Sequence, residues 1–452
     1  MRLFDRVISF AVVACLLLSV GVLAFSTYHF GNGALTWQKG LVGFVIPSAT
    51  ALGAWMTLRV SLAARRLIAL YAFCCAISVY AAQAFLLFRP AEMENSAAAL
   101  GQKLGLPVDP RTKREVIDDL RSQGKDAWPA VVTTKYLTSP IEHDGRSILP
   151  LSGISRVLSV NCNEFGTWMI YPADEHGFNN PLGLWQRQVH ILAIGDSFVH
   201  GACEPPGKDL VSVLRESEPA TLNIGIGGRG PLMELATFIE YAPTVRPALT
   251  LWFYYDGNDL VNLADERNRE ILMRYLRQDF SQGLINQQDA IDTALKQLVN
   301  QAASGDFRKS ARAAIVDFIL LRPLRATLGL NATGTVEVLT TVEDYLSLIP
   351  LFKETMTKAV KLAQSWNGKI VFVYLPSLEM LVDPKHIDTR QAVLNAARDS
   401  GLEILDLTAA FKAEDAAATR FWYGPGTHYS AEGYRFVAES VSRSIAQTKD
   451  LR

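Results

Sequence analysis

The chain has 452 residues, more than one average domain needs, and its 49% hydrophobic content excludes long disorder as its main feature. Its 44 basic and 45 acidic residues leave a net charge of -1, which gives no electrostatic signature of a nucleic-acid partner. Its 5 cysteines exclude a disulfide-dense scaffold but leave room for a single bridge.

The apolar residues gather at the start of the chain, in three nearly uncharged stretches at about residues 7–27, 41–61 and 67–88. Each is close to the ~20 residues that a helix needs to cross ~30 Å of hydrocarbon. The second contains Pro47, which neighbouring helices can tolerate. We expect residues 1–90 to be a membrane anchor with three transmembrane helices. A cleaved signal peptide is the alternative for the first stretch.

The basic residues of the short loops predict the orientation. Arg2 and Arg6 precede the first stretch, and Arg65 and Arg66 precede the third, whereas the loop between the first two carries Lys39 alone. The positive-inside rule then places the N-terminus in the cytoplasm and the chain after residue 88 on the other side of an inner or plasma membrane. In a Gram-negative source that side is the periplasm.

Residues 91–134 are mixed in character and contain several prolines, which predicts a partly helical linker. Residues 135–452 form the expected extracytoplasmic domain. Within it, charged and apolar residues at helical spacing over about residues 264–340 indicate a helical insertion. Two interpretations stay open for this insertion: a lid over a site, or a subdomain that serves packing.

Five short apolar runs alternate with helix-like stretches in the soluble part. This pattern is typical of parallel strands that are covered on both faces. We therefore expect an α/β fold, a three-layer, doubly wound, parallel five-stranded sheet, in which ligands bind beyond the carboxyl ends of the strands. The expected strands are residues 189–194, 221–226, 249–255, 369–375 and 402–407.

Glycine-containing polar motifs follow the first three strands, and a fourth precedes the last expected helix. They read GDSFVHG at 195–201, NIGIGG at 223–228, YYDGND at 254–259 and THYSAEGY at 427–434. Each motif alone is a weak signal, because such turns arise often by chance. Their joint order at one edge of the sheet is the specific observation.

These four motifs resemble the blocks of the SGNH (GDSL-type) hydrolase superfamily, over about residues 185–445, and the chain looks like a membrane-anchored member with the flavodoxin-like fold of that group. The resemblance implies that Ser197 is the nucleophile and His428 its general base. It also implies an oxyanion hole formed by the backbone N–H groups of Ser197 and Gly228 and the side-chain amide of Asn258. Family activities include esterases, lipases, thioesterases and carbohydrate O-acyl esterases or transferases.

Elementary chemistry supports these roles. A serine hydroxyl attacks an ester poorly until a base removes its proton, and a histidine can do so near neutral pH. Each donor that stabilises the oxyanion is worth ~3 kcal/mol in the transition state. No zinc-type cysteine and histidine spacing, phosphate loop or dinucleotide motif occurs, so we expect neither a metal nor a cofactor.

The chain departs from the family pattern in one place. The family usually has an aspartate two or three residues before its histidine, where this chain has Gly426 and Pro425. A backbone carbonyl near residues 422–426 could replace it and leave a Ser–His dyad, a carboxylate from elsewhere could substitute, or the site could be inactive. We expect the dyad.

Among the cysteines, Cys15, Cys74 and Cys75 fall in the membrane stretches, where they pack as small apolar residues. Cys162 and Cys203 fall in the exported part, and an oxidising compartment favours a disulfide between them. That bridge would fix the segment before the sheet beside the nucleophile loop; two free thiols are the alternative.

Other polar residues near these motifs have ordinary roles by default. We expect His200 to serve packing, and Asp196, Asp256 and Asp259 to stabilise turns.

Together these features predict a membrane-anchored extracytoplasmic serine esterase or O-acyltransferase. The resemblance and the topology suggest acyl esters of a cell-surface or exported glycan as the substrate. The expected partners are the lipid bilayer and the envelope polysaccharide machinery. A lipid or small-ester hydrolase is the first alternative. A catalytically silent, glycan-binding envelope component is the second, and the missing aspartate is its main support.

Overall fold

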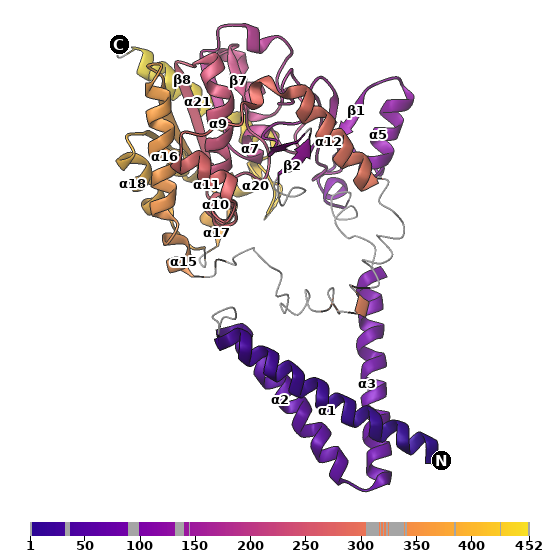
Figure 1. The fold of residues 1–452 in the computed structure, drawn as a ribbon. Helices are drawn as coiled ribbons and strands as arrows, with labels where there is room; N and C mark the ends of the chain where they lie inside the picture. Colours follow the sequence, from indigo (N-terminus) through magenta and orange to yellow (C-terminus); the bar gives the residue numbers. More distant parts are fainter. Residues whose placement is uncertain are drawn as a thin grey trace. The chain divides into compact units, whose positions relative to one another are not determined.

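The computed structural model describes residues 2–31, 37–88, 99–131, 140–143, 145–303, 316, 318–319, 321, 324, 339, 341–383, 386–424 and 426–450. The chain divides into two compact units (Figure 1). One comprises Met1–Pro90 with Asp306–Gly334, and the other comprises Ala91–Gly305 with Thr335–Arg452.

The first unit contains three helices, α1 (Arg2–Gly31), α2 (Trp37–Arg59) and α3 (Leu62–Phe88). Within the described residues, two helical windows are long and apolar enough to cross a membrane, Val7–Ala24 in α1 and Leu62–Phe85 in α3. The expectation of three spans is therefore corrected to two candidates. The second stretch does form a helix, but α2 is the least apolar of the three and contains Pro47.

Polar contacts join the beginnings of α1 and α3. The Arg66 guanidinium donates to both oxygens of Asp5, at 2.8 and 2.9 Å, and Arg65 Nη1 donates to Ser9 Oγ at 3.1 Å. The two basic segments from which we predicted the orientation thus lie at the same end of this unit, as the prediction requires. Which compartment they face stays a prediction.

A short part of the expected insertion packs on α3. The rings of Phe318 and Tyr80 lie 5.2 Å apart, and Leu324 N–H donates to Gln83 Oε1 at 3.0 Å. These contacts favour a packing role over a lid for this part of the insertion.

The second unit contains the expected parallel five-stranded sheet, with the strand order β10-β9-β8-β6-β7. The prediction of five parallel strands is confirmed. Its strands are β6 (Ile191–Ile194), β7 (Thr221–Asn223), β8 (Leu249–Tyr255), β9 (Lys369–Leu375) and β10 (Glu403–Asp406).

Side chains that alternate along the strands fill two separate cores. On β8, Trp252 and Tyr254 pack with the helices α9, α16 and α18, whereas Leu251 and Phe253 pack with α8, α19 and α21. Because both faces are covered, the strands consist of nearly continuous apolar residues, and the fold has three layers. These helices are α8 (Leu210–Ser217), α9 (Pro231–Val245), α16 (Ile349–Gln364), α18 (Arg390–Asp399), α19 (Thr408–Ala413) and α21 (Ala431–Asp450).

The first part of the insertion and the segments beside it are also helical. They contribute residues such as Tyr275 and Ile291 to the core that contains α9, α16 and α18. Much of residues 304–340 lies outside the described residues. The remaining elements of this unit are η1 (Leu184–Gln186), α7 (Ser197–His200), α10 (Asp259–Glu266), α11 (Glu270–Arg277), η2 (Leu284–Asn286), α12 (Gln288–Ala303), α15 (Val342–Leu346), α17 (Leu378–Val382) and α20 (Ala417–Arg420).

Part of the segment that we expected to be a linker is folded into this unit. Helix α5 (Lys113–Ser122) begins at a capping box formed by Thr112 and Glu115. Strand β1 (Ala127–Pro129) then pairs in parallel with β4 (Leu158–Val160), which pairs with β5 (Ile170–Pro172) in a small sheet. A separate hairpin joins β2 (Ile141–His143) to β3 (Arg146–Ile148). The loop between β4 and β5 carries a residue of the candidate site.

Candidate active site

The turn after β6 places Ser197 at the first position of α7. Gly195 has no room for a side chain, because a Cβ atom there would lie 2.6 Å from Val199 Cγ2 and 3.0 Å from the Phe253 carbonyl oxygen. Asp196 then caps the helix, since its Oδ1 accepts the Phe198 N–H at 3.0 Å. The close-packed glycine and the cap together fix the direction of the serine side chain.

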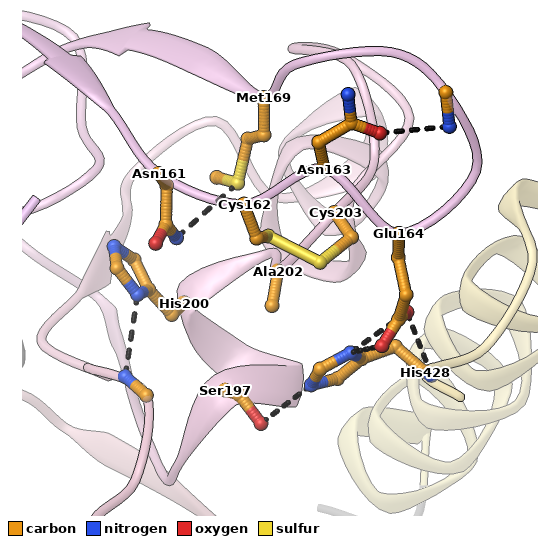
Figure 2. Close-up of a disulfide and its surroundings, with 12 residues drawn as sticks. Asn161, Cys162, Asn163, Glu164, Met169, Ser197, His200, Ala202, Cys203 and His428 are labelled. Atoms are coloured by element: carbon orange, nitrogen blue, oxygen red, sulfur yellow. Dashed lines mark hydrogen bonds and ion pairs between the residues drawn. A yellow bond between two sulfur atoms is a disulfide. The ribbon is translucent and has the colours of Figure 1, made fainter. Parts of the chain in front are cut away.

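The loop before α21 brings His428 to this serine. The loop is held by a β-bridge between Trp422 and Tyr429, and the Tyr429 hydroxyl donates to the Pro376 carbonyl oxygen at 2.8 Å. His428 Nε2 lies 2.8 Å from Ser197 Oγ, although the two residues are 231 positions apart in the sequence (Figure 2). The structure thus brings the expected nucleophile and base within hydrogen-bonding distance.

Glu164 occupies the place of the third group, on the other side of the imidazole. Its two carboxylate oxygens lie 3.1 and 3.0 Å from His428 Nδ1, and Oε2 also accepts the His428 backbone N–H at 3.1 Å (Figure 2). The expected Ser–His dyad is therefore wrong: a carboxylate from the β4–β5 loop replaces the aspartate. An ionised carboxylate is a stronger acceptor than the backbone carbonyl that we expected there.

The surroundings of His428 suit a general base. Burial lowers the pKa of His428, but the hydrogen bond and charge of Glu164, with the charge of Asp196, outweigh it and raise that pKa above its usual value. With the Nδ1 proton donated to Glu164, the Nε2 lone pair faces the Ser197 hydroxyl. The His428 and Glu164 side chains are 22% and 24% exposed, so the pair is reachable from solvent.

The expected oxyanion donors lie at this serine or on segments beside it. Ser197 N–H is the first of α7 and by its position has no acceptor within the helix. A Cβ atom on Gly227 would lie 3.4 Å from Ser197 Cβ, which places the loop after β7 against the nucleophile. Gly228, the expected donor, is the next residue along this loop and has a φ of 73°, which favours glycine.

Asn258 begins α10, just after β8. Its side-chain amide lies near Asp196, the neighbour of the nucleophile, and lowers the pKa of that carboxyl. Its Oδ1 is buried and has no hydrogen-bond partner within the described residues. An amide group carries two N–H donors, which suits it to stabilise an oxyanion.

His200 is buried, as its expected packing role requires, and it also contacts the loop after β7, residues 224–230, which we call the oxyanion loop. Its Nδ1 accepts the Gly227 N–H at 3.2 Å, and its Nε2 lies 2.8 Å from the Tyr171 hydroxyl. Burial, with the charges of Arg229 and His428, lowers the pKa of His200 to about 3, so the ring is neutral at physiological pH. A neutral imidazole that accepts at Nδ1 donates at Nε2, which fixes its tautomer.

The aspartates after β8 stabilise turns, as expected. Asp259 Oδ2 accepts a hydrogen bond from the Tyr255 N–H at 2.9 Å. The Asp256 carboxylate accepts hydrogen bonds from the Tyr374 hydroxyl and from the Ser377 hydroxyl, the latter at 2.9 Å.

Cys162 and Cys203 are joined by a disulfide bond, which lies directly beside the His428 and Glu164 pair (Figure 2). Within the described residues, Glu164, Cys203 and His428 form one group of potential metal ligands, with ligand atoms within 4.8 Å of one another. The Cys203 sulfur is committed to the disulfide and the Glu164 carboxylate to the imidazole. In this state the group is therefore not suited to hold a metal.

No family model and no curated protein matches the chain. Solved structures similar to it include an acetyl xylan esterase, at 13% identity over 57% of this chain and 100% of that one, with a TM-score of 0.32. A lipase/acylhydrolase from Enterococcus faecalis shares 14% identity over 57% and 95%, with a TM-score of 0.32. A GDSL-like lipase from Bacteroides thetaiotaomicron shares 10% over 58% and 90%, with a TM-score of 0.31. At these values no argument about activity rests on the likeness.

Proposed function

We propose that the chain is a membrane-anchored ester hydrolase or O-acyltransferase of the SGNH type, with Ser197, His428 and Glu164 as its catalytic triad. The observation that carries the proposal is the continuous line of contacts from Ser197 Oγ through the His428 imidazole to the Glu164 carboxylate. A nucleophile, a base and a group that orients the base are the three parts that serine catalysis requires.

In the first half of the reaction, His428 Nε2 takes the Ser197 proton while Oγ forms a bond to the ester carbonyl carbon. The carbonyl oxygen becomes negatively charged, and the N–H donors of Ser197, Gly228 and Asn258 stabilise it. The tetrahedral intermediate then collapses. The bond to the alcohol oxygen breaks, His428 returns its proton to that oxygen, and the acyl group stays on Ser197.

In the second half, another hydroxyl attacks the acyl group. His428 removes a proton from it, and the Ser197 ester bond breaks with return of the proton to Oγ. If the attacking hydroxyl belongs to water, the reaction is hydrolysis; if it belongs to a sugar, the reaction is acyl transfer. Glu164 holds the imidazole in the productive tautomer and stabilises its cation in both halves, a role whose loss costs about 10⁴-fold in rate in the serine-protease template.

The finer parts of the proposal concern substrate and location. We assign the site to the extracytoplasmic side and its substrate to the acyl esters of a cell-surface or exported glycan. The beginnings of α1 and α3 lie at the same end of the first unit, so these two apolar helices run in the same direction and α2 leads the chain back between them. With that basic end in the cytoplasm, the chain after α3 lies on the other side of the membrane. The glycan substrate follows from the family resemblance together with this topology. A lipid or small-ester hydrolase remains the second candidate, because apolar helices would also bring the site close to lipid substrates. The interpretation as a catalytically silent, glycan-binding component loses its main support, since Glu164 lies where the missing aspartate would act on His428.

The direct test uses the full chain, purified in detergent, with p-nitrophenyl acetate as substrate. We expect Ser197→Ala to lower kcat by at least about 10³-fold, because the nucleophile is lost. Ser217→Ala, which removes a hydroxyl from α8 in the same unit, is the matched control and should keep the wild-type rate. Equal rates for wild type and Ser197→Ala would contradict the proposed function.

A second measurement separates the substrate classes. Acetyl groups on the surface polysaccharide are measured in a strain that carries Ser197→Ala in place of the wild-type chain. Reduced acetylation indicates transfer to the glycan, and raised acetylation indicates hydrolysis from it. Unchanged acetylation contradicts the glycan assignment; if it is accompanied by altered acyl esters in the lipid fraction, the lipid-hydrolase alternative is supported.

A further inference from the structure

We propose that the Cys162–Cys203 disulfide positions Glu164 for catalysis, so that the oxidised chain is the fully active form and reduction lowers its activity. The inference rests on the proposed function, since it concerns the acid of the same triad.

Glu164 lies on a loop that belongs to a different sheet from the one that carries the nucleophile. The loop leaves β4 and returns at β5, and two backbone hydrogen bonds close its ends. The Asn161 N–H donates to the Met169 carbonyl oxygen at 2.9 Å, and the Met169 N–H donates to the Cys162 carbonyl oxygen at 2.8 Å. Within the loop, Asn163 Oδ1 accepts the Gly166 N–H at 2.7 Å. These bonds shape the loop itself but do not fix it to the catalytic sheet.

Cys203, by contrast, is firmly placed relative to the nucleophile. It lies six residues after Ser197, and the intervening backbone is fixed because the Ala202 N–H donates to the Ser197 carbonyl oxygen at 2.9 Å. The hydroxyl of Tyr434, from α21, also donates to the Ala202 carbonyl oxygen at 3.2 Å. The disulfide therefore connects the Glu164 loop to a rigid point beside the active site (Figure 2).

The backbone at Cys203 has a conformation that cysteine does not favour. Its φ is 66°, in the left-handed region that favours glycine, and the residue is only 6% exposed. A residue with a Cβ atom is costly in this conformation. A free thiol does not offset this cost, whereas a disulfide gives the position a covalent role.

The remaining attachments of the Glu164 loop to the nucleophile side are non-covalent. Phe165 packs against Tyr423, with ring centroids 3.9 Å apart and ring planes tilted by 48°, and shares a small apolar cluster with Ala202 and Cys203. The Glu164 carboxylate itself binds His428. Glu164 is partly exposed, so water competes for its carboxylate once the covalent connection is cut. We expect the reduced chain to stay folded while Glu164 leaves His428 part of the time.

Reduction by a phosphine is balanced as follows. The phosphine gives two electrons to the S–S bond, water supplies one oxygen and two protons, and the products are two thiols and a phosphine oxide. A dithiol would do the same by exchange, with formation of its own disulfide.

The experiment uses the full chain in detergent, in a background where Cys15, Cys74 and Cys75 are replaced by serine so that the pair under test is the only source of thiols. This background keeps the wild-type rate if the proposal holds. The chain is treated with tris(2-carboxyethyl)phosphine, desalted without oxygen and assayed with p-nitrophenyl acetate, and a thiol titration verifies two new thiols. A chelator is present throughout, because a freed Cys203 thiolate beside His428 and Glu164 could bind zinc.

We expect kcat/KM to fall about 10- to 100-fold on reduction, as for a misplaced catalytic group, and to recover on reoxidation. The acid limb of its pH profile should also move to lower pH, because the Glu164 interactions that raise the pKa of His428 are weakened. A purely structural role of the disulfide would not move this limb.

The decisive comparison repeats the reduction in Glu164→Gln. If the disulfide acts through Glu164, reduction produces no further fall in this variant. An equal fall in kcat/KM with Glu164 and with Glu164→Gln, or no fall in the chain that keeps Glu164, overturns the inference. A chain whose hydrolysis does not depend on Ser197 refutes the proposed function instead, so the two failures are distinguishable. Cys162→Ser with Cys203→Ser gives an independent reduced state, and its thermal unfolding shows whether a lost rate reflects a lost fold.

Discussion

At the scale of single residues, the pair formed by Glu164 and His428 determines how the site works. Burial alone would lower the pKa of His428, and the adjacent carboxylate reverses that effect. A carboxylate on Nδ1 is what makes a partly buried imidazole an effective base, because the cation that forms during catalysis is then compensated.

Glu164→Gln tests this interaction through the pH profile. The variant keeps an amide oxygen as acceptor for the Nδ1 proton but loses the negative charge, so the pKa of His428 should fall from its raised value. Because the base must be neutral, kcat/KM rises as pH increases through this pKa. The acid limb should therefore lie at lower pH in the variant, with a plateau at least about 10²-fold lower than in the wild type. An unchanged limb would show that Glu164 does not govern the base.

His200 offers a test of the oxyanion loop. His200→Phe removes the acceptor of the Gly227 N–H and leaves a buried donor unpaired, which typically costs about 1–3 kcal/mol. We expect kcat to fall more than KM rises, because the loop acts on the transition state. Tyr171→Phe is the matched control: it also leaves a buried donor unpaired, the His200 Nε2–H, but it keeps the Gly227 contact. It should therefore cost similar stability and have a small effect on kcat. Equal losses of kcat in both variants would contradict the role given to His200.

The sequence could predict some of these residues and not others. Ser197 and His428 stand in motifs with a fixed order relative to the strands, whereas Glu164 lies 264 positions before its partner in a segment with no motif. The available signal was indirect. The predicted disulfide already placed Cys162 beside the nucleophile loop, so a carboxylate two residues further on was a candidate for the missing acid.

At the scale of elements, the central sheet was predictable and its surroundings were less so. Apolar runs of six or seven residues identified the strands, since a parallel strand covered on both faces needs such a run. Strand β1 has only three residues, which is too short to show a periodic pattern, and its partner β4 lies about thirty residues later in the chain. This is why residues 113–129 were interpreted as a linker. The second of the three expected membrane spans does form a helix, α2, but it is less apolar than α1 and α3 and contains Pro47, so only two candidate spans remain.

The turn between β6 and α7 should tolerate no side chain at Gly195. Gly195→Ala would bring Cβ against Val199 and the backbone of Phe253, so the strand and helix would have to separate at the nucleophile. We expect a loss of about 1–3 kcal/mol in the free energy of unfolding and a lower kcat. Gly424→Ala adds the same methyl group where no atom lies within 4 Å, and should leave stability unchanged. Thermal unfolding of both variants in detergent measures the difference, and similar stabilities would contradict this account.

At the scale of the whole molecule, the proposed topology is open to direct labelling. Arg59→Cys lies at the last residue of α2, just before α3, and Lys412→Cys lies on α19 in the second unit. In spheroplasts of an expressing bacterium, we expect a membrane-impermeant maleimide to label Lys412→Cys at once and Arg59→Cys only after permeabilisation. The reverse pattern would place the candidate site in the cytoplasm, where thiols are kept reduced, and would also remove the setting in which the disulfide persists.

The central claim is that Ser197 is an activated nucleophile within a triad completed by His428 and Glu164. Its most direct measurement is covalent labelling by an alkyl fluorophosphonate, in which the serine oxygen bonds to phosphorus and fluoride leaves, followed by mass analysis of the peptides. We predict one label, on Ser197, at a rate that is lower in Glu164→Gln and near zero in His428→Ala. An unlabelled wild-type chain, or equal labelling rates in wild type and His428→Ala, would contradict the account.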